Sequence, residues 1–192
     1  MTTGRDTSIR TPLFMKGWQA IAYSRLWTML LLAAGVASSL ISAHAPLAAF
    51  AAASGLTLPR PRAIKMVTTI WAVNQGLGFT LWRYPLETTA FAWGAIMGVG
   101  ALLAVNLASR SPEALRRSWG GYWAWGAIAL VGSVALYQGL IGLMFPVLAG
   151  GPALGWGMVG KLVAKQAAWA IAIAACHALW LKSAIYFSQR SR

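Results

Sequence analysis

The chain has 192 residues, of which 58% are hydrophobic and only 10% are charged, so its composition excludes an ordinary water-soluble domain. Its 16 Lys and Arg residues outnumber 3 Asp and Glu residues and give a net charge of +13, while a single cysteine excludes an intrachain disulfide. The three carboxylates are not placed to pair, which excludes a two-carboxylate hydrolase or a carboxylate-rich metal site. Basic clusters between long uncharged runs are typical of a multi-pass membrane protein.

The uncharged runs predict an all-α membrane helix bundle with six spans. A basic cytoplasmic N-terminal segment (residues 1–25) precedes a single transmembrane domain (26–187) and a basic C-terminal tail (188–192). We expect the spans at 26–43, 47–58, 66–85, 88–108, 119–145 and 161–187, because a helix of about 20 residues crosses a bilayer. Pro46 predicts a turn after the first span. The second segment is only ~18 Å long at helical rise, so we expect it to be short or re-entrant and buried between its neighbours.

The distribution of basic residues favours six spans over five. Six spans place thirteen Lys and Arg residues on one side and only Arg83, Lys161 and Lys165 on the other, whereas a single crossing by residues 26–58 gives nine against seven. By the positive-inside rule, the larger group marks the cytoplasm. The sequence therefore predicts a multi-pass protein of the plasma (inner) membrane with both termini cytoplasmic.

Two segments leave alternatives open. Residues 26–37 followed by Ala43-His44-Ala45 are similar to a signal peptide with its cleavage site, but Pro46 stands directly after the expected cut and favours a retained anchor. Residues 146–160 contain five glycines and two prolines. This composition predicts an outer loop or a re-entrant element that lines a cavity.

The third span carries the most unusual polar residues. Asn74 and Gln75 are adjacent amides near the middle of the membrane, and on a helix they share one face with Trp71, Gly78 and Trp82. Such a face is expected to look into the bundle. There the amides either bond to neighbouring helices or line a cavity.

The last span repeats this pattern with Gln166, Trp169, His177 and Trp180 at helical spacing, and we expect this stripe to face the third span. An intramembrane histidine is either hydrogen-bonded within the bundle or part of a ligand site. With a further amide on the fifth span, the candidate ligand-binding residues are Trp71, Asn74, Gln75, Gln138, Trp169 and His177.

Tryptophan and glycine positions give further expectations. Seven of the eleven tryptophans lie near predicted span ends, where indole rings favour the headgroup region. The other four lie deeper, and each indole N–H needs a neighbouring carbonyl or a ligand as acceptor: Trp71, Trp93, Trp125 and Trp169. Gly94 and Gly98 form a G-x-x-x-G pattern that we expect to serve helix packing within the bundle.

Two family likenesses follow from these features. Residues 73–79 (Val-Asn-Gln-Gly-Leu-Gly-Phe) resemble the asparagine-glycine-phenylalanine segment of the lipoprotein signal peptidase family, whose activity depends on two aspartates in later helices. This chain has no aspartate after Asp6, so the resemblance implies no protease activity here. In size, six-span layout and alanine-rich short segment, the chain is similar in outline to the membrane-embedded substrate-binding components of energy-coupling-factor vitamin transporters. A shared architecture does not by itself imply a shared function.

The leading functional hypothesis is a protein that binds or passes a small solute at an aromatic and amide-lined site. Because no intramembrane carboxylate is available for proton or sodium coupling, active transport would need a partner that supplies energy. The alternative is a non-catalytic scaffold or accessory subunit of a membrane complex. An enzyme would depend on His177 or on a cofactor such as haem held by His44 and His177, and we expect neither catalysis nor a cofactor nor a metal. The expected partners are the lipid bilayer, a small solute and a membrane protein subunit, without nucleic acid.

Overall fold

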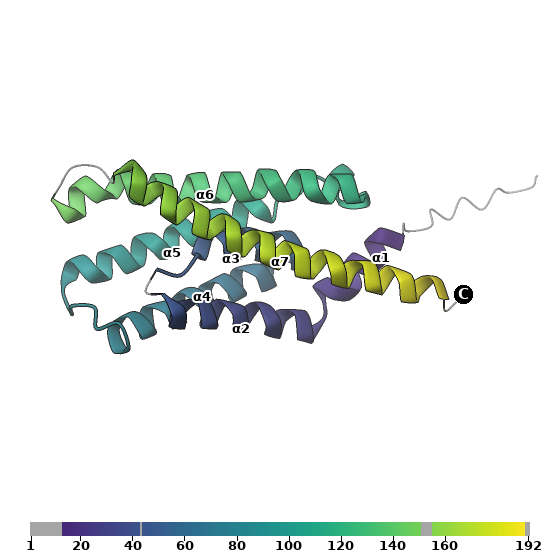
Figure 1. The fold of residues 1–192 in the computed structure, drawn as a ribbon, viewed down its shortest axis with the longest axis horizontal. Coiled ribbons are helices and arrows are strands. Elements are labelled where there is room, and N and C mark those ends of the chain that lie inside the picture. The colour runs from purple at the N-terminus through teal and green to yellow at the C-terminus, as the bar shows by residue number, and fades with distance from the viewer. Residues whose placement is uncertain (1–12, 43, 151–154, 191–192) are drawn as a thin grey trace, which may run out of the picture.

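The computed structural model describes residues 13–42, 44–150 and 155–190, and this part of the chain is helical without any strand (Figure 1). In chain order, its elements are α1 (Leu13–Ala22), α2 (Arg25–Ile41), α3 (Leu47–Thr57), α4 (Arg60–Thr80), α5 (Thr88–Ala108), the short 3-10 helix η1 (Glu113–Arg117), α6 (Trp119–Ala149) and α7 (Trp156–Arg190).

Three of these helices are long and apolar enough to cross a membrane: α5, α6 and the part of α7 from Trp156 to Tyr186. A fourth crossing arises if α1 and α2, which meet at a bend of 59°, are counted as one broken span. Apolar side chains such as Val131 and Leu143 on α6 face outward, which is unfavourable in water but suits lipid. The described part of the chain is therefore helical throughout and has three or four helices suited to cross a membrane.

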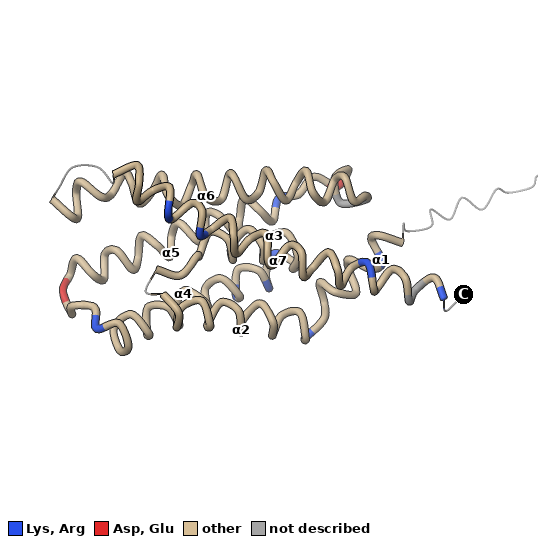
Figure 2. The backbone as a smooth tube through the Cα atoms, viewed as in Figure 1, with Lys and Arg blue, Asp and Glu red and all other residues tan. Residues whose placement is uncertain are grey.

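The six helices from α2 to α7 alternate in direction (Figure 1). α2, α4 and α6 run one way, and α3, α5 and α7 run back. Most Lys and Arg residues lie toward one end of the bundle, on the right in Figure 2, where α2 begins at Arg25, α4 begins at Arg60 and α7 ends at Arg190. The opposite end holds the α2–α3, α4–α5 and α6–α7 connections.

Helix α3 is short and enclosed. It packs against α4, α5, α6 and α7, and most of its side chains are buried. Alanines let these neighbours approach closely, and at Gly55 an added Cβ would lie 2.6 Å from the Ala108 Cβ and 2.9 Å from the Val105 carbonyl oxygen. A half-helix with exposed backbone ends would be unfavourable in hydrocarbon, so its enclosure by other helices explains how it is tolerated.

The second half of the predicted N-terminal segment (residues 1–25) is helical. Residues 13–22 form α1, which packs on the end of α7: an added Cβ at Gly17 would touch Leu181 and Ile185. Phe14 and Ile21 are buried on the same face. Residues 1–12, Ala43 of the cleavage pattern, residues 151–154 and residues 191–192 lie outside the described part of the chain.

Several predicted boundaries were wrong. Helix α4 begins at Arg60 instead of residue 66, because Pro61 suits the first turn of a helix, where no intrahelical N–H bond is lost. It ends at Thr80 instead of residue 85. The chain then turns, with Arg83 in the left-handed region at φ 52°.

The proposed outer loop at 146–160 was also too long. Pro146 lies inside α6, which continues to Ala149 and ends where Gly150 takes the left-handed conformation at φ 63°. Glycine adopts this conformation without a Cβ clash and is therefore a favourable helix end. Because α7 begins at Trp156, the connection is limited to residues 150–155.

Candidate functional site

A cavity of about 430 Å³ lies among α4, α5, α6 and α7, near the end of the bundle that holds the α4–α5 and α6–α7 connections (left in Figure 1). Three glutamines line it from three different helices: Gln75 on α4, Gln138 on α6 and Gln166 on α7. We call it the glutamine cavity. The start of α3 reaches it through Ala45 and Pro46.

The glutamines retain unused hydrogen-bonding groups. Gln166 is buried, and its Oε1 accepts a hydrogen bond of 2.9 Å from the Ala49 backbone N–H, which leaves its Nε2 without a partner among the described residues. Gln138 is half-buried and makes no side-chain hydrogen bond within the same part of the chain. Gln75 donates a long bond of 3.4 Å to the Asn74 Oδ1, and its own Oε1 is unbonded there. Free amide groups in a membrane bundle are unfavourable unless a ligand or water satisfies them.

Two charged residues also line the glutamine cavity. Lys165 is half-buried, and its Nζ donates to the Ser42 Oγ and, at 2.6 Å, to the His44 carbonyl oxygen. Glu87 is exposed and lies directly before α5. Among the described residues Glu87 makes no ion pair, not even with Arg83 in the same turn.

The surroundings of two loop side chains near the cavity shift their pKa values. Burial, and then the positive charge of Lys165, lower the pKa of His44, which favours its neutral form. Burial raises the pKa of Tyr84, so the phenol stays protonated. At neutral pH, the described lining therefore carries one cation and one anion.

Part of the lining of the glutamine cavity is aromatic and apolar. Trp93 from α5 and Phe145 from α6 lie with ring centroids 6.1 Å apart, and Tyr137 and Met97 contribute further surface. The Trp93 indole N–H has no acceptor within the described residues. Such a wall can stack on a planar ligand while the indole N–H donates to it.

Two of the other predicted residues form a layer behind Gln75. The Trp71 Nε1–H donates to the Gly94 carbonyl at 2.8 Å, and its ring lies against Gly98. Asn74 is almost fully buried, and its Nδ2 has no hydrogen-bond partner in the part of the chain that the structure describes. The Gly94–Gly98 pattern therefore receives α4 side chains within the bundle and does not line the cavity.

The remaining two predicted residues lie outside the glutamine cavity. Trp169 packs against Phe50 on α3, with ring centroids 5.6 Å apart. His177 is fully buried nearer the basic end, where its Nδ1 lies 3.0 Å from the Tyr122 hydroxyl and its ring lies 5.0 Å from that of Trp27. The expectation that this α7 stripe faces the third span was wrong, because α3 lies beside α7, and α7 packs mainly against α1 and α3.

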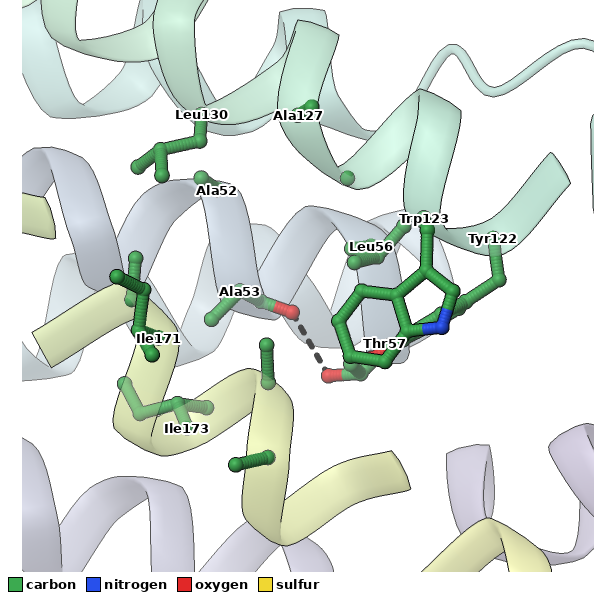
Figure 3. A pocket seen from close by; sticks show the side chains of 14 residues that line it. Ala52, Ala53, Leu56, Thr57, Tyr122, Trp123, Ala127, Leu130, Ile171 and Ile173 are labelled. Carbon is green, nitrogen blue, oxygen red and sulfur yellow. Dashed lines mark hydrogen bonds between the residues drawn. The ribbon is translucent and has the colours of Figure 1, made fainter. Parts of the chain in front are cut away.

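A second, apolar groove of about 260 Å³ lies between α3, α6 and α7 (Figure 3). Small residues such as Ala52, Ala53 and Ala127 line it beside Trp123 and Ile171. The Thr57 hydroxyl is turned back onto its own helix by a 2.7 Å bond to the Ala53 carbonyl, drawn as a dashed line. This groove offers little hydrogen bonding.

Sequence reasoning overlooked several cavity residues. Lys165 was counted only among the basic residues of the outer side, Trp93 only as one of the deep tryptophans, and Glu87 was not singled out. A signal was present for Lys165, because it stands well inside a long apolar helix, where a charge needs a structural or functional reason.

The chain matches no protein-family model, and it has no significant match among curated proteins or solved structures. Among the described residues, no three His, Cys, Asp or Glu side chains lie close enough together to hold a metal ion.

Proposed function

We propose that this protein binds a small solute in the glutamine cavity and presents or passes it across the plasma (inner) membrane, without catalysing a reaction. The observation that carries the proposal is that Gln138, Gln166 and Trp93 line one cavity, and each has a side-chain polar group without a hydrogen bond to any described residue. Pockets with a few convergent polar groups on an otherwise apolar wall are typical of small-molecule sites.

The proposal includes a topology of six membrane-spanning segments, α2 to α7, with both termini in the cytoplasm. Alternating helix directions and the concentration of basic residues at one end support it. In this arrangement, the glutamine cavity lies toward the outer surface. No intramembrane carboxylate is present to couple solute movement to an ion gradient, so an energy-supplying partner subunit would drive any active transport.

Filling the cavity tests this function. We expect small molecules that copurify with the wild-type protein in lipid nanodiscs to be lost from Gln138→Trp, because the indole occupies the solute's space. The matched control is Gly139→Trp on the same helix, at a position where an added side chain meets open space. Mass spectrometry of extracted small molecules provides the measurement. Identical profiles from all three proteins would contradict solute binding at this cavity.

The apolar groove favours a second candidate, a scaffold or accessory subunit. Its small residues would let a partner's transmembrane helix approach α3 closely. Native mass spectrometry after gentle extraction separates this candidate from the first. A stoichiometric protein partner that is lost in Ala127→Phe would support the scaffold, whereas an unaccompanied, solute-loaded monomer would support solute binding.

A further inference from the structure

The two charges of the glutamine cavity lack counter-ions. The Lys165 ammonium bonds to two neutral acceptors, the Ser42 hydroxyl and the His44 carbonyl, and it has a third proton to donate. Neither Lys165 nor Glu87 forms an ion pair with any residue that the structure describes. A charge drawn into a helix bundle is unfavourable unless an opposite charge compensates it. A ligand with a negative group would provide this compensation for Lys165.

Other groups near Lys165 also suit an anion. The buried Gln166 has an unpartnered Nε2 donor, although its Oε1 is fixed by Ala49. The N-terminal end of α3, which the cavity reaches at Pro46, carries the partial positive charge of a helix start. The cavity thus has a donor-rich end formed by α7 and α3.

The rest of the cavity has a different character. Glu87 is exposed and presents a carboxylate, which suits a donor such as an ammonium group. Trp93 and Phe145 offer aromatic faces to a planar group. Because the described lining has one cation and one anion, a ligand with no net charge matches it better than an ion of either sign.

We propose that the glutamine cavity binds a small zwitterionic solute with an aromatic or similar planar part, with the carboxylate at Lys165 and Gln166 and the amino group toward Glu87. This inference rests on the proposed solute-binding function and adds the class of ligand. Amino-acid-like compounds have this combination of groups.

Three probes that share a phenyl ring test the proposal: L-phenylalanine (zwitterion), 3-phenylpropionate (anion) and phenethylamine (cation). Equilibrium dialysis against the full-length protein in nanodiscs at pH 7 measures their affinities. We expect the wild type to bind L-phenylalanine at least about tenfold more tightly than either of the others, since each charged hydrogen bond contributes about that factor or more. Equal affinities, or no binding of any probe, would overturn the proposal.

Two variants test which charged residue of the cavity binds which charged group of the ligand. Lys165→Met should weaken L-phenylalanine and 3-phenylpropionate by about tenfold and leave phenethylamine unchanged, whereas Glu87→Gln should weaken only the two amines. Lys161→Met is the matched control, because Lys161 is exposed on the same helix and does not line the cavity. A loss in Lys161→Met equal to that in Lys165→Met would refute a specific carboxylate site.

A further variant tests whether Lys165 binds the ligand or only holds the α2–α3 connection in place. Ser42→Ala removes one hydrogen bond to Lys165 but keeps the ammonium group, so it should retain most of the L-phenylalanine affinity. If it weakens binding as much as Lys165→Met, then Lys165 only positions the α2–α3 connection. The ligand class can fail while the solute-binding function holds. If the wild type copurifies with a solute that lacks opposite charges, and Gln138→Trp loses that solute, only the zwitterion proposal is overturned.

Discussion

Polar side chains inside this bundle differ in whether they line a cavity or are enclosed by other side chains. The Gln138 side chain makes no hydrogen bond within the described chain and lines a cavity. The His177 ring, in contrast, packs against Trp27 and is hydrogen-bonded to the Tyr122 hydroxyl. The Nε2 of His177 has no hydrogen-bond partner among the described residues, but His177 does not line the glutamine cavity. We infer that His177 contributes to packing.

The first prediction concerns His177→Ala. It should destabilise the folded protein by about 2–4 kcal/mol, because it leaves a cavity and an unpaired Tyr122 hydroxyl in the bundle. Thermal unfolding in detergent, followed by size-exclusion chromatography, measures the loss. The solutes retained at the glutamine cavity should not change. A protein of normal stability that had lost its solute would instead place His177 in the binding site.

At the level of helices, α3 determines how the bundle is arranged. Its alanine-rich surface lets α4, α5, α6 and α7 surround it, and its first turn is tied to α7 by the Gln166–Ala49 hydrogen bond. At its other end, the Trp27 Nε1–H donates to the Thr57 hydroxyl at 3.0 Å. Side chains from other helices therefore make hydrogen bonds to α3 near both of its ends. Lipid hydrocarbon could not provide such bonds.

The second prediction concerns the closest approach of α3 and α5. Gly55→Ala should lower stability by about 1–3 kcal/mol, because the new methyl group meets Ala108 and the α5 backbone, which cannot move aside easily. Gly139→Ala is the control, since its Cβ meets open space. Thermal unfolding of both variants under the same conditions measures the difference. Equal stability of the two would contradict the close packing of α3 on α5.

On the scale of the whole molecule, the alternation of helices requires the α1–α2 and α5–α6 connections to lie on the same side of the membrane. Tyr23 and Ala114 mark these two connections and are both exposed. Leu86, in the α4–α5 connection, is exposed at the opposite end. If α2 and α3 together crossed only once, Tyr23 and Ala114 would lie on opposite sides.

The third prediction is that single cysteines report this arrangement. In a Cys176→Ser background, a membrane-impermeant maleimide should label Leu86→Cys in intact cells, but Tyr23→Cys and Ala114→Cys only after permeabilisation. The basic end of the bundle should stay in the cytoplasm during insertion. Labelling of Tyr23→Cys and Ala114→Cys from different sides would exclude the six-span topology.

Composition and periodicity alone predicted the helical class, helices suited to a membrane and the inward direction of Asn74 and Gln75. Apolar runs must form helices to satisfy their backbone in lipid, and an amide among them must find a polar environment. The same reasoning selected Gln138. These conclusions depend only on local composition and helical periodicity.

Which polar residues meet depends on how the helices pack against one another. Trp169 and His177 share a helical stripe with Gln166, but α7 is long, and the glutamine cavity borders only its first turns, while α3 separates the rest of α7 from α4. Lys165 and Glu87 are far apart in the sequence and reach one cavity because α5 and α7 pass its opposite sides. Periodicity fixes the face of one helix, whereas the contacts between helices depend on the volumes of all the side chains that pack between them.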